Sequence, residues 1–309
     1  MTIFGNGSAG SKHISVDTIF DVNEFNLQYK DFTIDATVTL TIPSGAILRC
    51  HGTFTNNGTL IVPTAAAGGQ YGNYSSSTID GGNRPAHPGV TAGAAGTGAI
   101  DPGTIFHGTG AAVGGKGGIG LQGFAARQLL KPGAYGGGGG AASYEGPGAP
   151  GGGSLVILAR SGILNSNTGI IRAAQPDEPT YGAGGGGGGW LIFASSAHIT
   201  NAGNIEANGG NAYHFSAGSF GAGGGGGGGL VHFVAPTVTI GNVSVAAGKK
   251  GADGPGGGNS PVAGGGGGGG CYGNGGDGSS VTNDNPDNNA TDGQPGAVFA
   301  SQMDPQDLF

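Results

Sequence analysis

Uninterrupted glycine runs that lead directly into apolar segments constrain this chain more than any other feature. Residues 184–189 are all glycine, and Trp-Leu-Ile-Phe-Ala follows at 190–194. The same unit recurs at 151–159 and at 223–234. The apolar segments begin at residues 155, 190 and 230, so they are spaced by 35 and 40 residues. Self-similarity with this period is typical of stacked repeat units.

A second pattern follows each apolar segment. Residues 163–171, 199–205 and 238–243 each contain a short β-prone segment, an Asn/Gly turn and another β-prone segment, and residues 56–62 resemble them. Asn and Gly tolerate positive φ, which suits corners and hairpins. The sequence therefore predicts a mainly-β repeat architecture of short strands, a β-solenoid or a β-sandwich, with almost no α-helix.

The glycine content requires a structural explanation. The chain contains 76 Gly among 309 residues, yet 36% of its residues are hydrophobic and 9% are charged, which opposes disorder. Ordering a glycine costs about 0.5–1 kcal/mol more than ordering an alanine, so neighbouring segments must compensate. Lateral N–H to C=O bonds between polyproline-II-like helices would do so. We expect packed polyglycine-II helices, in which the alanines at the edges of the runs face outward: Ala141, Ala183, Ala222 and Ala263.

Composition divides the chain into three regions. Residues 1–64 are poorest in glycine, alternate apolar and polar residues at 32–42, and are interpreted as a β-rich attachment and scaffold region. Residues 65–150 form a Gly/Ala-rich region. Residues 151–309 hold the repeats of glycine run and strand, together with the loops that would bind a partner.

Charge and hydropathy exclude several classes of protein. A net charge of −7 with few Lys and Arg disfavours nucleic-acid binding. Because no apolar run approaches 18 residues, no transmembrane helix is expected. The first seven residues lack the basic and apolar parts of a signal peptide, so synthesis in the cytoplasm is expected. Cys50 and Cys271 have no nearby partner in sequence and are predicted to be buried thiols.

Catalytic and metal-binding motifs are missing. The Gly-x4-Gly-Lys spacing at 110–116 lacks the Ser or Thr of a phosphate loop, and the Asn/Asp tract at 282–293 breaks the calcium-loop pattern. The seven histidines show no metal-ligand spacing, and His198 and His232 are interpreted as structural. The sequence therefore predicts no catalytic residue, no metal and no cofactor. Glycoside cleavage needs two facing carboxylates, for which the candidates in the repeat region are Asp177, Glu178, Glu206 and Asp253.

Aromatic residues lie in the segments between the glycine runs. Aromatic rings with polar tips offer contact area at a low cost in rotamer entropy, which suits recognition of glycans or proteins. Covering the edges of the glycine layer is the alternative role. The candidate receptor-binding residues are Tyr181, Tyr213, His214, Phe215, Phe220 and Tyr272.

Glycine runs separated by short variable segments, after a β-rich N-terminal part, resemble the glycine-rich tail-fibre adhesins of tailed bacteriophages. The resemblance covers mainly residues 134–300, and residues 32–62 resemble the β-solenoid coils of phage fibres and head spikes. It implies a non-enzymatic virion protein that recognises a bacterial surface polysaccharide or outer-membrane protein. It also implies contact with other virion proteins through the N-terminal region. Fibres and spikes are often homotrimers, with a monomeric tip as the alternative.

Other functions stay open at this point. A capsid spike or decoration protein that binds capsular polysaccharide keeps the virion location but moves the protein to the head. A tailspike-like depolymerase would use Asp177 or Glu206. An ice-binding glycine-helix protein needs a flat, regular Thr/Ser/Ala face, which the irregular repeat lengths and bulky aromatic residues oppose.

Overall fold

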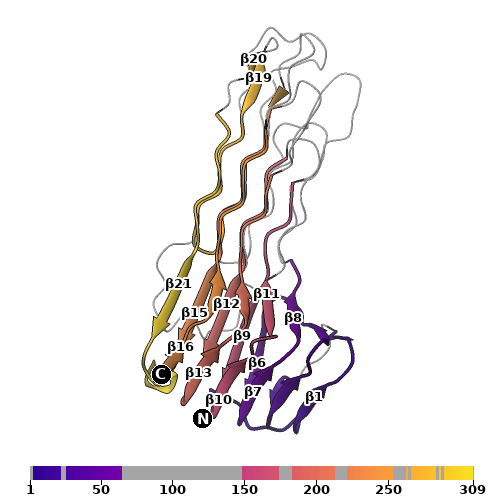
Figure 1. Ribbon diagram of the computed structural model, residues 1–309, viewed down its shortest axis with the longest axis vertical. Coiled ribbons are helices and arrows are strands. Elements are labelled where there is room, and N and C mark those ends of the chain that lie inside the picture. Colours follow the sequence, from indigo (N-terminus) through magenta and orange to yellow (C-terminus); the bar gives the residue numbers. More distant parts are fainter. Residues whose placement is uncertain are drawn as a thin grey trace.

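The computed structural model describes residues 3–21, 26–64, 148–173, 183–212, 221–252, 262–263, 266–282, 285–286 and 289–308. Eighteen of its strands form three parallel sheets of six strands each, which surround a common core in the lower half of the molecule (Figure 1). Sheet A contains β1 (Lys12–Ile14), β4 (Phe32–Ile34), β7 (Thr53–Asn56), β10 (Gly162–Asn165), β13 (His198–Asn201) and β16 (Thr237–Thr239).

Sheets B and C complete the solenoid. Sheet B contains β2 (Thr18–Ile19), β5 (Thr39–Thr41), β8 (Thr59–Val62), β11 (Ile170–Ala173), β14 (Asn204–Glu206) and β17 (Asn242–Ser244). Sheet C contains β3 (Gln28–Tyr29), β6 (Ala46–Cys50), β9 (Ser154–Ala159), β12 (Trp190–Ala194), β15 (Leu230–Val234) and β21 (Ala297–Ser301). The chain visits A, B and C in turn, so three successive strands make one coil, and six coils stack.

This architecture confirms the predicted mainly-β repeat fold and selects the solenoid over the sandwich. The strand pairing also confirms the predicted repeats, because Ile163 lies opposite Ile199, and Ile171 lies opposite Ile205. In sheet C, Trp190 pairs with Ser154, one residue earlier than the apolar pattern suggested. Residues 1–64 and 151–309 contribute strands to the same three sheets.

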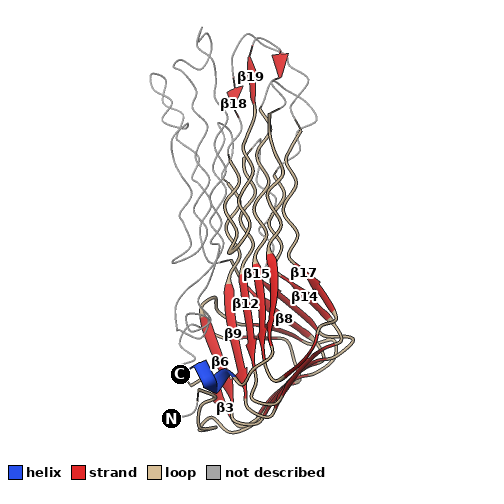
Figure 2. Ribbon diagram, turned by 90° about the vertical axis from the view of Figure 1, so that its left-hand side faces the viewer, coloured by secondary structure: helices blue, strands red, loops and turns tan. Residues whose placement is uncertain are grey.

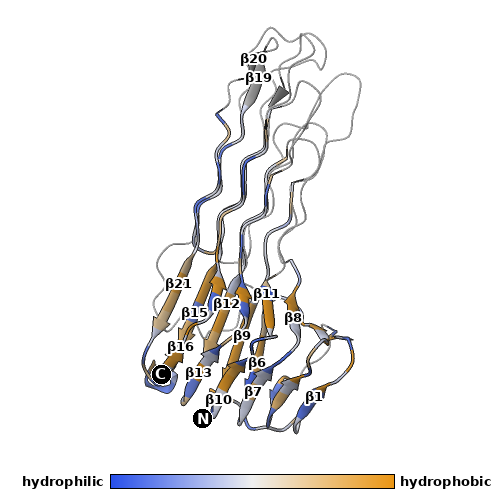
Figure 3. Ribbon diagram, in the orientation of Figure 1, coloured by the Kyte–Doolittle hydropathy of each residue, from blue (hydrophilic) through white to orange (hydrophobic). Residues whose placement is uncertain are grey.

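The core lies inside the coils. Alternate residues of each strand point inward, and stacking places like residues above one another, as in the row Leu40, Leu60, Ile171 and Ile205. Phe32 and Phe54 stack with ring centroids 5.8 Å apart, as neighbours in sheet A. Hydrophobic residues accordingly gather in the solenoid strands (Figure 3). Burial of these rows is the main stabilising contribution, at about 25 cal/mol per Å² of apolar surface.

A ladder of buried asparagines closes the corner between sheets A and B. The Asn56 side-chain amide donates to Asn165 Oδ1 at 2.8 Å, and that of Asn165 donates to Asn201 Oδ1 at 2.7 Å. The Asn201 amide continues to the Asn242 carbonyl at 3.1 Å. The ladder bonds the last four coils to one another where the backbone turns.

A second apolar cluster covers the outer face of sheet C. Its members include Trp190, Ile192 and Leu230, so β12 and β15 are buried on both faces. This explains why these strands are continuously apolar instead of alternating. The N-terminal segment contributes Phe4, and the 3-10 helix at Pro305–Leu308 contributes Leu308 (Figure 2). The two ends of the chain therefore pack on the same face.

Two predictions about individual residues have clear outcomes. Cys50 and Cys271 are free and buried, as predicted, and burial raises the pKa of both thiols. The prediction that the edge alanines face outward is wrong for Ala183 and Ala222, because both are buried. The glycine runs therefore accommodate a Cβ at these two buried positions. The side chains of Ala141 and Ala263 lie outside the description.

Candidate functional site

Long insertions leave the solenoid at a single corner, between sheets B and C. In the first two coils only residues 20–27 and 42–45 separate the strand of sheet B from the strand of sheet C. In each of the last four coils a long segment separates the strand of sheet B from the next strand of sheet C. These segments are residues 63–153, 174–189, 207–229 and 245–296. We call these four insertions the glycine arms. Their described parts run side by side away from the sheets, so the corner produces a projection (Figures 1 and 2).

The arms are held together by lateral backbone hydrogen bonds. Three successive amides of the run at 223–229 donate to three different neighbouring segments. The pairs are Gly225 N to Thr291 O at 3.1 Å, Gly226 N to Gly210 O at 2.9 Å, and Gly227 N to Gly268 O at 2.9 Å. Each glycine therefore faces a different neighbour from the residue before it.

The bonding repeats every three residues. Gly185 N donates to Gly224 O at 2.9 Å, and Gly188 N donates to Gly227 O at 2.7 Å, so both chains advance by three residues between bonds. Three residues per turn is the period of the polyproline-II helix. The lateral bonds supply the compensation that ordering so many glycines requires.

Close packing between the arms explains why these runs consist of glycine. A Cβ at Gly226 would overlap the carbonyl oxygen of Gly186, and one at Gly187 would overlap that of Gly269. These are backbone atoms in buried runs, so they cannot swing aside as a flexible side chain would. At such positions only glycine allows the segments to approach to hydrogen-bonding distance.

Polar side chains also connect neighbouring segments of the glycine arms, which together we call the bundle. Asn208 Oδ1 accepts from Ser244 Oγ and from Ala246 N, both at 2.7 Å. Three residues later, Asn211 Oδ1 accepts from Lys249 N at 2.8 Å. The signal that could have revealed these roles is the spacing of three in Ala-Asn-Gly-Gly-Asn at 207–211, which places both asparagines on one face of a threefold helix.

An ion pair fastens the outgoing and returning parts of the last arm. Lys249 Nζ lies 2.9 Å from Asp292 Oδ2, and Lys250 N donates to Asp292 Oδ1 at 2.9 Å. The backbone bond from Lys250 lowers the pKa of Asp292, and Lys249 adds to this effect. Both side chains of the pair are well exposed, so the ion pair itself contributes little to stability.

The far end of the last arm carries a small antiparallel sheet. It contains β18 (Val262–Ala263), β19 (Ser280–Thr282) and β20 (Asn285–Pro286). This sheet lies at the opposite end of the molecule from the solenoid (Figure 1). The arm therefore ends in structured backbone away from the three main sheets.

The predicted receptor-binding residues fall mostly outside this description. Tyr181, Tyr213, His214, Phe215 and Phe220 lie outside the described residues.

Tyr272 is half-buried where the bundle meets sheet C. Its ring centroid lies 5.8 Å from that of Phe299 in an edge-on contact, and it packs against the outer apolar cluster. The preceding residue, Cys271, donates its N–H to Gly188 O at 3.1 Å, next to the start of β12. The structure thus places Tyr272 away from the distal sheet and gives it a packing contact.

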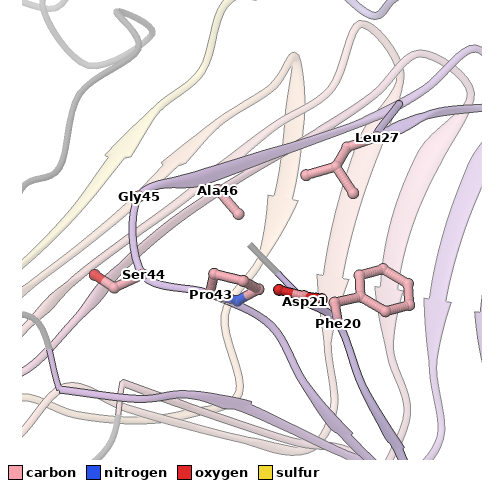
Figure 4. A pocket seen from close by; sticks show the side chains of 7 residues that line it. All are labelled: Phe20, Asp21, Leu27, Pro43, Ser44, Gly45 and Ala46. Atoms are coloured by element: carbon pink, nitrogen blue, oxygen red, sulfur yellow. The ribbon is translucent and has the colours of Figure 1, made fainter. Parts of the chain in front are cut away.

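A cavity of about 250 Å³ lies at the same corner in the first two coils. Figure 4 shows its lining by Phe20, Asp21, Leu27, Pro43, Ser44, Gly45 and Ala46. This lining is mainly apolar and includes one carboxyl group. Paired-carboxylate hydrolysis of a glycoside needs two, so the cavity lining does not supply that chemistry.

Of the carboxylates considered for a depolymerase, the structure describes only Glu206. Glu206 accepts from Arg172 Nε at 2.7 Å on the outer face of sheet B, and Asp177 lies outside the described residues. Among the residues described, no group of three or more His, Cys, Asp or Glu could hold a metal ion. No helix within the described ranges is long and apolar enough to cross a membrane.

Comparison with known proteins gives no relative from which a role could be transferred. No protein-family model, no curated protein and no solved structure matches this chain.

Proposed function

We propose that this protein is a receptor-binding adhesin of a tailed bacteriophage, located at the tip of a fibre or spike. The observation that carries the proposal is the common origin and direction of the glycine arms. Four successive coils send their insertions out from one corner, and the described segments bond laterally as they leave. The described parts of the arms therefore form a projection that extends away from the solenoid (Figure 1).

Rigidity is the property that a binding tip requires. A loop on an ordered scaffold binds without the full entropic cost of ordering a flexible chain. In the run at 223–229, the amides of residues 225–229 are all bonded to neighbouring segments. Lateral bonding therefore allows a chain rich in glycine to support loops at a distance.

The aromatic segment at 213–220 is the strongest candidate for the binding loop. Gly226 N donates to Gly210 O, and Gly229 N donates to Ala207 O, so the outgoing and returning halves of this arm run antiparallel. In the sequence, residues 213–220 connect these two halves. The segment contains Tyr213, His214 and Phe215, whose rings suit a sugar face or an apolar protein patch.

A cell-binding measurement tests the proposal. The fluorescently labelled full chain would be incubated with a panel of bacterial strains, with purified surface polysaccharides and with outer-membrane vesicles. Replacing Tyr213, His214 and Phe215 with Gly and Ser should leave folding intact and reduce binding at least tenfold.

The matched control replaces Val16 and Ile19 with Ser. Both are highly exposed apolar residues on the first coil, and neither lies on an arm. This control should bind like the wild-type protein. Equal binding by the loop variant, or release of reducing sugar from the polysaccharide, would contradict a non-enzymatic adhesin that reads its receptor through this loop.

A further inference from the structure

The last glycine arm contains a hairpin of two glycine runs. Gly270 N donates to Gly273 O at 2.7 Å, and Gly267 N donates to Gly276 O at 2.8 Å, so the two runs are antiparallel. Strands β18 and β19, at the far end of the bundle, continue the same pairing (Figure 2). We call the described parts of residues 262–282 the inner hairpin.

The inner hairpin differs from the other described runs in how it joins the solenoid. The other runs adjoin a strand of sheet B or sheet C directly in the sequence, at residues 153, 189, 206, 229, 244 and 296. The strands therefore set the positions of these runs along the bundle. The inner hairpin lies in the middle of the segment between β17 and β21, so no strand of the three main sheets adjoins its described ends.

Backbone hydrogen bonds alone do not select one position for the inner hairpin. Gly268 N donates to Gly185 O at 2.8 Å, and three residues later Cys271 N donates to Gly188 O at 3.1 Å. Because this pattern repeats every three residues, a hairpin displaced by three residues meets equivalent carbonyl groups. Such a displacement is about 9 Å long, at about 3.1 Å per residue. Glycine-rich strands slip in register for the same reason.

The tip of the inner hairpin carries side chains that distinguish one position from another. Cys271 and Tyr272 are the only apolar residues in the sequence between 266 and 279. Cys271 is fully buried in the outer apolar cluster on sheet C, and Tyr272 packs against that cluster. A displacement away from the solenoid by three residues would withdraw both side chains from the cluster.

We propose that Cys271 and Tyr272 anchor the inner hairpin and set its register in the bundle. Burial of the two side chains at the base favours one of the positions that the glycine backbone allows. Because β18 and β19 lie at the other end of the same hairpin, the anchor also fixes how far the distal sheet extends from the solenoid. Tyr272 is then a positioning residue for a sheet that it does not contact.

The neighbouring segment offers a direct readout of the register. Asn274 Nδ2 donates to Gln294 Oε1 at 3.0 Å, and Asp277 N donates to Thr291 Oγ1 at 2.8 Å. Displacing the hairpin outward by three residues brings position 274 beside position 291. A disulfide between positions 274 and 294 therefore reports the observed register, and one between 274 and 291 reports the displaced register. The two bonds exclude each other because bridged Cα atoms lie within about 7 Å.

The rate of disulfide formation under brief, mild oxidation tests the proposal. The reference chain carries Cys271→Ala, which removes the native thiol from the tip and keeps an apolar side chain there. It also carries Asn274→Cys with either Gln294→Cys or Thr291→Cys. In this chain the 274–294 bond should form at least tenfold faster than the 274–291 bond. With Cys271→Gly and Tyr272→Gly this ratio should fall at least tenfold, because losing this much apolar burial changes an equilibrium by about that factor.

Two controls separate register from general destabilisation. Tyr272→Phe keeps the ring at the tip and should keep the reference ratio. Leu164→Gly removes a 38% exposed side chain from β10 in sheet A and should also keep it.

Two outcomes would overturn the anchor. One is a reference chain that forms both bonds at the same rate, and the other is a folded tip variant that keeps the reference ratio. If the double tip variant does not fold, Tyr272→Gly alone takes its place, because Tyr272 is only half-buried. An unchanged ratio in that variant would refute the anchor equally. The readout comes from the purified chain, so no outcome bears on cell binding by the arms.

Discussion

At the residue scale, the structure assigns different roles to residues that look alike in the sequence. His198 and His232 both occur in short β-prone segments, but His198 is exposed on sheet A and His232 is buried between neighbours in sheet C. His232 Nε2 lies 2.8 Å from Ser301 Oγ, and its ring faces Phe299. Burial lowers the pKa of His232 from 6.5 to about 4.

This shift predicts how stability depends on pH. Because the folded pKa is lower than the unfolded one, the contribution of the neutral ring is complete above about pH 6.5 and is lost as the pH falls toward 4. In this window the free energy of unfolding should fall by about 1.4 kcal/mol per pH unit through this group. His232→Gln should remove that slope in urea unfolding measured between pH 4 and 7. His198→Gln should keep it, and an unchanged slope in both variants would refute the assignment.

At the element scale, the glycine arm behaves as a structural element and not as a linker. Its backbone groups are paired between segments, as they are in a sheet, and its buried glycines face carbonyl oxygens of neighbouring runs. The element therefore depends on its neighbours in the same way as a strand does.

Gly226→Val tests this dependence. A Cβ at Gly226 would meet the carbonyl oxygen of Gly186, so the runs must separate and their lateral bonds must break. We expect a loss of about 3 kcal/mol or more in the free energy of unfolding, at or beyond the upper end for overpacked interiors. Ala246→Val is the control, because Ala246 is exposed on a neighbouring segment and should change stability by about 0.5 kcal/mol at most. Wild-type stability in Gly226→Val would mean that the runs are not packed.

At the scale of the whole molecule, the bundle and the solenoid share one junction. The glycine run at 184–189 continues directly into β12, and Trp190 N donates to Gly153 O at 2.9 Å at the point where they join. Trp190 is the single tryptophan of the chain and is buried in the outer cluster. Its fluorescence therefore reports on the junction.

The shared junction predicts that bundle and solenoid unfold together. Thermal unfolding followed by Trp190 fluorescence should coincide with unfolding followed by far-ultraviolet circular dichroism, which reports mainly on the strands. In Gly226→Val both transitions should move to lower temperature by the same amount. Two separated transitions would instead show that the arms and the coils are independent units.

The sequence by itself determined the local elements of this protein. Apolar segments such as 190–194 and the Asn/Gly turns identified the strands and the repeat, because period, composition and turn chemistry act over a few residues. Ordering glycine costs backbone conformational entropy, and the need to offset this cost also predicted that the runs pack laterally. These inferences depend on what a segment can do wherever it is placed.

Only the tertiary structure decided how these elements meet. Stacking in register showed that residues 1–64 and 151–309 build the same coils and that every arm leaves from one corner. It also buried Ala183 and Ala222, and it placed Tyr272 against Phe299. Such outcomes depend on contacts between residues far apart in the chain, which local patterns do not encode.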